Sequence, residues 1–152
     1  MSLGNLGQAE ADALMYMEKH YVDGKLLKYP GQGQELEIPL VSADKRESFI
    51  LDVSRGNINL SKVKYQERAR QVEALVRLEL GGPPHRNPDD SEIGVPHIHI
   101  YKEGFGDKWA YEVPLDRFPR LSDIYGTLDD FMAYCNITQT PKFLRIQREL
   151  SL

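Results

Sequence analysis

The stretch "VEALVRLEL", residues 72–80, decides the fold, because apolar side chains recur in it at every second position. The positions that define this period are Val72, Ala74, Val76, Leu78 and Leu80. Consecutive side chains of a β-strand point to opposite faces of a sheet, so the pattern predicts a strand with one buried and one polar face. "ESFILDVS" (47–54), residues 57–61 and "HIHIY" (97–101) show the same period. We therefore expect an antiparallel sheet at the centre of the protein.

Two more strands and a long loop are predicted around this sheet. "ELEIPL" (35–40) predicts an edge strand, because Pro39 has no backbone N–H to donate. "KWAYEV" (108–113) predicts the partner of "HIHIY" in a hairpin. Residues 81–96 form a Gly/Pro-rich loop between "VEALVRLEL" and that hairpin. Loops of this length inside compact domains are often functional.

Helical patterns lie at both ends of the sequence. Apolar residues at helical spacing predict an amphipathic helix over 7–21, ended by Asp23-Gly24. Thr127 with Asp130 resembles a capping box and predicts a second helix, which Asn136 closes. The apolar face of that helix consists of Leu128, Phe131, Met132 and Cys135. Residues 141–150 predict one more short element, a helix rather than a strand.

These patterns together predict a single α+β domain over residues 1–152. It would contain an N-terminal helix, a mostly antiparallel sheet of about five or six strands and a C-terminal helix. The chain is long enough to bury a substantial core without covalent cross-links. Residues 1–3, "MSL", are set aside as an expression scar.

Composition indicates the compartment and excludes several classes of protein. The single cysteine, Cys135, excludes an internal disulfide framework and suits a reducing compartment. No apolar run approaches the roughly 18 residues of a membrane span. The N-terminus lacks the basic and apolar regions of a signal peptide. We therefore expect a cytoplasmic protein that does not contact a membrane.

Basic side chains gather in residues 55–77, which carry six basic and two acidic residues. This segment is therefore +4 in a chain whose net charge is −4, which leaves −8 for the remainder. A local cationic patch attracts phosphate groups or an acidic partner. The same composition also fits a solvated strand and turn.

The candidate site lies in "HIHIY" (97–101). Alternation places the two isoleucines on the apolar face and His97, His99 and Tyr101 on the polar face, free for chemistry. Arg77, Glu79 and Asp52 fall on the polar sides of their own strands by the same reasoning. If these strands share one sheet, all of these side chains gather on one face.

Phosphate chemistry is the function that we expect first, with RNA or another phosphate-containing ligand as the partner. Cleavage of RNA without a metal needs a base, an acid and cations that stabilise the charge. His97 and His99 would act as base and acid, with His85 from the loop as a third participant, and no cofactor would be needed. The substrate-binding residues on this hypothesis are Arg77, Lys62, Arg68 and Tyr101.

Two other functions fit the same residues. His97 and His99 would both reach Zn²⁺ or another divalent metal, with a third ligand from His85, Glu103, Asp107 or Glu79. A non-enzymatic module would instead use the polar face and the loop to dock a partner protein. The sequence has no glycine-rich nucleotide loop, no serine nucleophile motif and no CxxC pair. The residues alone leave these hypotheses open.

Four stretches resemble a family of small bacterial and prophage proteins to which no activity is assigned. They are "RGNINLSKVKYQERAR" (55–70), "LELGGPPHRNPD" (78–89), "VPHIHIYKEGFGDKWAYEVP" (95–114) and "DDFMAYCNI" (129–137). The resemblance covers about residues 48–137 and implies a bacterial or prophage cytoplasmic protein. It also implies that the loop around His85 and the strand of His97 and His99 belong to one unit.

Overall fold

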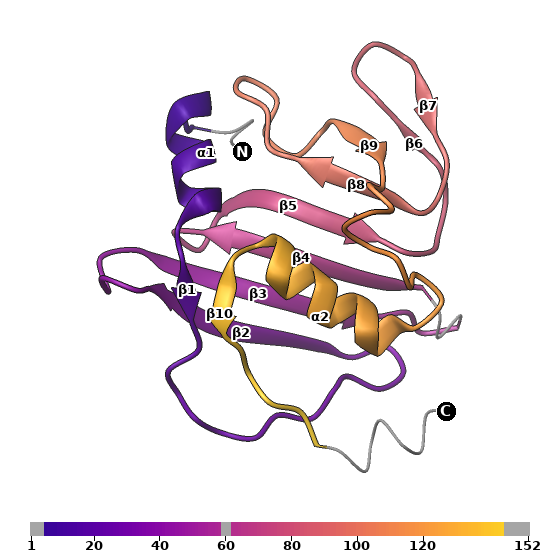
Figure 1. Cartoon of the computed structure of the whole chain (residues 1–152). Coiled ribbons are helices and arrows are strands. Elements are labelled where there is room, and N and C mark those ends of the chain that lie inside the picture. Colours follow the sequence, from indigo (N-terminus) through magenta and orange to yellow (C-terminus); the bar gives the residue numbers. More distant parts are fainter. Residues whose placement is uncertain (1–4, 59–61, 145–152) are drawn as a thin grey trace.

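The computed structural model describes residues 5–58 and 62–144 and has the α+β fold that the sequence predicts (Figure 1). Its centre is an eight-stranded sheet in the order β10-β1-β2-β3-β4-β5-β8-β9. The strands are β1 (Lys19–His20), β2 (Glu35–Ser42), β3 (Ser48–Arg55), β4 (Val63–Ala69), β5 (Glu73–Glu79), β8 (His97–Ile100), β9 (Ala110–Glu112) and β10 (Ile137–Gln139). All neighbouring strands are antiparallel except β1 and β10, which are parallel.

The strand number exceeds the five or six expected, because the additional strands are too short to show a period in the sequence. β1 and β10 have two and three residues. The loop 81–96 contains a small separate hairpin of β6 (His85–Arg86) and β7 (Glu92–Ile93). This hairpin stands beyond β8 and β9 at one side of the molecule (Figure 1).

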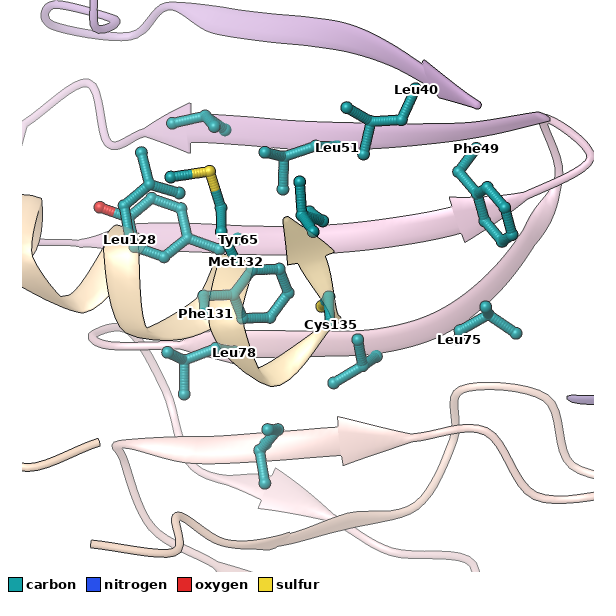
Figure 2. Packing of buried hydrophobic residues seen from close by; sticks show 14 of the residues in the cluster. Leu40, Phe49, Leu51, Tyr65, Leu75, Leu78, Leu128, Phe131, Met132 and Cys135 are labelled. Atoms are coloured by element: carbon teal, nitrogen blue, oxygen red, sulfur yellow. The ribbon is translucent and has the colours of Figure 1, made fainter. Parts of the chain in front are cut away.

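The core lies between one face of the sheet and helix α2 (Ile124–Tyr134), which crosses the strands (Figure 1). Figure 2 shows Phe131 and Met132 of α2 packed among strand side chains that include Tyr65 and Leu78. The predicted apolar face of this helix is confirmed, because Leu128, Phe131, Met132 and Cys135 are all buried. Covering this face leaves the opposite face of the sheet to polar side chains.

The predicted start of α2 is wrong by three or four residues. Asp123 is the N-cap, and its carboxylate accepts from the backbone N–H groups of Tyr125 and Gly126. Thr127 lies inside the helix instead, where its hydroxyl donates to the carbonyl of Arg120. The predicted end is confirmed, because Asn136 follows the helix in the left-handed conformation, at φ 59°.

Helix α1 (Gln8–Tyr16) is shorter than the predicted helix over 7–21. The chain leaves the helix at Met17 because Lys19 and His20 pair with both β2 and β10 in the sheet. Its buried residues are Ala11 and Leu14, whereas Ala9 and Ala13, which fall at the helical spacing that predicts the helix over 7–21, are exposed. Tertiary pairing of β1 outweighs the helical period here.

Three strand predictions also need correction. β2 is an interior strand and not an edge strand, because β1 and β3 flank it. The short β1 pairs only with Val41 and Ser42, so the missing N–H of Pro39 disrupts no ladder. Val72 lies in the turn before β5 and is 75% exposed. Within β5 the register with β4 shifts near Arg68, so the alternation that Leu78 follows begins only at Val76. Residues 56–58 form no strand. The rest of the predicted strand 57–61 lies outside the described residues, as does most of the predicted element 141–150.

A buried ion pair lies in the core beneath α2. Lys19 and Glu67 are both fully buried, with 3.3 Å between the ammonium nitrogen and Oε2 of the carboxylate. The Lys19 ammonium also donates to the carbonyls of Met15 and Cys135, at 2.7 and 2.8 Å. Neither Glu67 oxygen has a well-aligned hydrogen-bond donor. Burial raises the pKa of Glu67 to about 7, against the opposing effect of Lys19.

We expect the stability of the protein to fall as pH rises through 7 because of Glu67. The ordinary carboxyl pKa of 4.5 applies to the unfolded chain, whereas the folded value is about 7. Between these values the folded state binds more protons, so unfolding becomes easier as pH rises, by on the order of 3 kcal/mol in total. Chemical denaturation of the wild type and Glu67→Gln from pH 4.5 to 8 measures this effect. A stability difference between the two that stays constant over this range would contradict the expectation.

In the part of the chain that the structure describes, neither helix has the length and apolar character needed to cross a membrane.

Candidate metal centre

Two rows of polar side chains cross the face of the sheet away from α2. The first row consists of Asp52, Gln66, Arg77 and His99, and the second of Ser54, Lys64, Glu79 and His97. Residues that are paired directly across neighbouring strands project from the same face. The register therefore confirms that the histidine pair, Arg77, Glu79 and Asp52 share one face.

His97 and His99 lie on the polar face, as expected, but the loop 81–96 covers them there. His97 and His99 are each 1% exposed. The imidazole of His85, in β6, lies against both, with ring centres 4.6 Å from His99 and 6.0 Å from His97. Asn87 fixes the hairpin in place, because its amide exchanges two hydrogen bonds with the backbone of Ala110 in β9. The structure thus brings the three histidines together.

Backbone carbonyls orient all three imidazoles. Nδ1 of His97 donates to the carbonyl of Gly94 at 2.9 Å, and Nδ1 of His99 to that of Asp107 at 2.8 Å. Nε2 of His85 donates to the carbonyl of Lys108 at 2.7 Å. A carbonyl only accepts hydrogen bonds, so each of these nitrogens carries the proton. In a neutral imidazole the other nitrogen then presents its lone pair.

The lone pairs of the two strand histidines face the carboxylate of Glu79. Nε2 of His97 lies 3.5 Å from Oε1, and Nε2 of His99 lies 3.5 Å from Oε2. Both Nε2 atoms are buried without a hydrogen-bond partner. Buried nitrogens without partners are costly, and three acceptor groups that face one another repel unless a cation lies among them. A proton on one imidazole lets that ring donate to the carboxylate but leaves the other Nε2 without a partner. A metal ion would bind both Nε2 atoms and the carboxylate.

The charges around the site favour a neutral histidine beside an ionised carboxylate. Burial and the nearby Arg77 guanidinium lower the pKa of His99 to about 4. Burial alone would raise the pKa of Glu79, but the hydrogen bond and charge of Arg77 outweigh it and hold that pKa below its usual value. A neutral imidazole and an anionic carboxylate are the forms that bind metals.

The spacing of these groups fits a transition-metal ion. One ligand atom each from Glu79, His97 and His99 lies within 4.8 Å of the others. Bonds of about 2.0–2.1 Å in a tetrahedral site place neighbouring ligand atoms about 3.4 Å apart, and each imidazole Nε2 lies 3.5 Å from a different oxygen of Glu79. Imidazole ligands that donate their other nitrogen to a carbonyl are typical of metal sites, because that bond fixes the ring and its tautomer.

The residues predicted to bind phosphate are placed less favourably. Arg77 donates to Glu79 at 2.7 Å and to Asp107 at 2.6 Å. Arg68 makes a two-pronged contact with Asp52, at 2.7 and 2.8 Å. Their charges are therefore compensated within the protein. The exposed side chain of Lys62 lies beside Gly82 at the start of the loop.

Two other predicted site residues are used elsewhere. Tyr101 follows the last residue of β8, and its buried hydroxyl exchanges hydrogen bonds with the backbone of Leu6, next to α1. Its predicted place beside the histidines is wrong, because the strand ends before it. Glu103, one of the predicted third ligands, accepts from the backbone N–H of Gln8 at the start of α1. Of the four predicted third ligands, Glu79 faces both imidazoles.

An open groove of about 470 Å³ runs over the polar face beside the candidate centre. Its charged lining consists of Glu35, Glu37, Asp52, Glu79, Lys64, Arg68 and Arg77. Acidic side chains outnumber basic ones there, so the groove is not the cationic patch that the charge of residues 55–77 suggests. Glu79 and Arg77 belong to both the groove and the candidate centre.

Several contributors to this site carry no sequence signal. The carbonyls of Gly94, Asp107 and Lys108 act through the backbone, whose position depends on the tertiary fold. Asn87 is one of several polar residues in a turn-rich loop, and its contact with β9 spans 23 positions of sequence. The exposure of the histidines also could not be predicted, because alternation identifies the face of a strand and not what covers it.

Fold and site together define an α+β protein in which two buried histidines and the partly buried Glu79 cluster between the sheet and a covering hairpin. A model for a family of unknown function, DUF6978, matches residues 6–137, so the chain belongs to that family. This agrees with the resemblance to a family without an assigned activity. Comparison with curated proteins and with solved structures found no match.

Proposed function

We propose that this protein binds a divalent transition-metal ion, with Zn²⁺ as the best fit, through Glu79, His97 and His99. The observation that carries the proposal is the pair of buried, partnerless Nε2 atoms, each 3.5 Å from a Glu79 oxygen. Imidazole and carboxylate ligands suit Zn²⁺, whereas Ca²⁺ and Mg²⁺ prefer oxygen ligands alone. Arg77 supports the site, because its hydrogen bond orients the Glu79 carboxylate.

Metal content and affinity test this proposal directly. The protein should be prepared without an affinity tag, stripped with a chelator and titrated with Zn²⁺ against a chromophoric competitor. We expect one equivalent of Zn²⁺ per chain. His97→Ala and Glu79→Gln should each lose more affinity than the roughly 10- to 100-fold typical of changes to outer-shell partners, because they remove a ligand itself.

His20→Ala is the matched control for these variants. His20 lies in β1, contacts Glu18 and is separated from β8 by four strands, so its loss should leave the affinity unchanged. Circular dichroism of each variant checks that the fold is retained. The proposal fails if the stripped wild type binds no Zn²⁺, Co²⁺ or Ni²⁺ at micromolar concentrations, or if folded Glu79→Gln binds as tightly as the wild type.

The other predicted functions stay proposals with less support. Metal-independent cleavage of RNA needs accessible histidines and free cations, but His97 and His99 are buried and Arg77 is paired with acidic groups. A cleavage assay with single-stranded RNA at low salt, in the presence of a chelator, would test it. Docking of a partner protein, a bacterial origin and a cytoplasmic location likewise remain predictions from the sequence.

A further inference from the structure

We infer that His85 is the fourth ligand of the proposed metal centre, so that metal binding fastens the hairpin β6–β7 to the sheet. This inference rests on the proposed function. Zn²⁺ sites with a structural role hold four protein ligands in a closed tetrahedral arrangement. Glu79, His97 and His99 supply three, and the near-complete burial of both strand imidazoles indicates a closed site.

The position of His85 identifies it as the fourth ligand. Its ring lies against both strand imidazoles, with ring centres at 4.6 and 6.0 Å. Two carboxylates nearby are less suitable. The side chain of Asp107 is 41% exposed, and Glu112, although opposite His97 in β9, is also exposed, whereas a closed site needs ligands that are shielded from solvent.

The hydrogen bonding of His85 also matches that of a ligand. Its Nε2–H donates to the carbonyl of Lys108, next in sequence to Asp107, whose carbonyl orients His99. Nδ1 of His85 is therefore the nitrogen left with a lone pair. All three imidazoles thus have one nitrogen fixed by a backbone carbonyl and the other available, which is the outer-shell pattern of metal-bound histidines.

Coordination by His85 would pull the hairpin toward the sheet. His85 does not belong to the set of ligand atoms within 4.8 Å of one another, so its ring must move inward to bind. It is only partly buried, and Gly82 at the start of the loop has a φ of 103°, which a glycine adopts without strain. The hydrogen bonds of Asn87 with Ala110 hold the hairpin at the end of β6. A bond from His85 to the metal would add a strong link between the start of β6 and the sheet.

The number of imidazoles around the metal tests the inference. X-ray absorption spectra of the Zn²⁺-loaded wild type should fit three imidazoles, and those of His85→Ala should fit two. His20→Ala should keep all three. His85→Ala should still bind one equivalent of Zn²⁺, because Glu79, His97 and His99 remain, but its affinity should fall by more than the roughly 10- to 100-fold typical of changes to outer-shell partners.

Limited trypsin digestion provides an independent readout of the hairpin. Arg86 is exposed in β6, next to His85, and Lys45 is exposed in the turn between β2 and β3. Saturating Zn²⁺ should slow cleavage after Arg86 in the wild type by roughly tenfold or more, because cleavage requires local opening of the hairpin. Cleavage after Lys45 should not change. In His85→Ala, saturating Zn²⁺ should give no such protection at Arg86.

The outcomes separate this inference from the proposed function. If the wild type binds one Zn²⁺ but its spectrum fits two imidazoles, and trypsin cleaves His85→Ala and the wild type alike, His85 is not a ligand and the three-residue site stands. If the wild type binds no metal, both proposals are wrong. Three imidazoles with Zn²⁺-dependent protection at Arg86 that is lost in His85→Ala would establish the inference.

Discussion

Replacement of Lys19 by methionine is expected to lower the free energy of unfolding by about 3–5 kcal/mol, the cost of breaking a buried ion pair on one side. At pH 8, above the Glu67 pKa of about 7, Lys19→Met leaves the fully buried Glu67 carboxylate without its counter-charge. It also leaves the carbonyls of Met15 and Cys135 without their donor. Domains of this size are stable by about 5–15 kcal/mol, so the change removes a large part of the total. Urea denaturation followed by circular dichroism measures it.

Two further variants make this result specific to the buried pair. Lys25→Met changes an exposed lysine in the segment between β1 and β2, and its effect should stay within about 0.5 kcal/mol. The double variant Lys19→Met with Glu67→Leu should regain part of the loss, because apolar pairs of similar volume often replace buried ion pairs without cost. A Lys19→Met protein within 1 kcal/mol of the wild type would contradict the role of this ion pair.

Zinc is expected to stabilise the folded protein by about 4 kcal/mol when the free ion exceeds its dissociation constant a thousandfold. A ligand that binds only the folded state adds RT ln(1 + [L]/Kd), so each further tenfold rise in free Zn²⁺ adds about 1.4 kcal/mol. For a domain of this length that corresponds to roughly 3–6 °C in Tm per tenfold rise. This slope does not depend on the affinity. Thermal denaturation in chelator-buffered Zn²⁺ measures it.

The ligand variants determine whether this stabilisation comes from the proposed centre. Glu79→Gln and His97→Ala should shift the rise in Tm to much higher Zn²⁺ concentrations, while His20→Ala should follow the wild-type curve. A Tm that rises equally in His97→Ala would indicate binding elsewhere on the chain. A wild-type Tm that is constant over all buffered concentrations would contradict the metal centre altogether.

Much of the architecture could be predicted from the sequence, because it depends on the period of the apolar residues. The alternation around Leu78 and Ile98 identified the strands β5 and β8, whose core-facing side chains pack toward α2. The helical period of Leu128, Phe131 and Met132 identified the buried face of α2. Periodicity fails where tertiary pairing overrides it, as in the strand β1, which interrupts the helical pattern before Lys19.

The candidate centre could be predicted in part. Alternation placed His97 and His99 on the polar face, and Glu79 was among four predicted third ligands. Choosing among the four required the register of β5 and β8, which pairs Glu79 with His97. Register is not encoded in the period of a single strand, because it depends on the turns and on the packing of the whole sheet.

The sequence by itself determined that Arg77, Glu79, His97 and His99 turn away from the apolar core, because the pleat of a strand is a local property of the backbone. Only the tertiary structure decided that His97 and His99 are buried. The hairpin that carries His85 folds back over them, and Asn87 binds it to β9. The tertiary structure likewise placed Arg77 between the carboxylates of Glu79 and Asp107. These carboxylates compensate the charge of Arg77, which the sequence analysis took as available for phosphate. Burial and ion pairing depend on groups far apart along the chain, and those two properties favour a metal over a phosphate at this site.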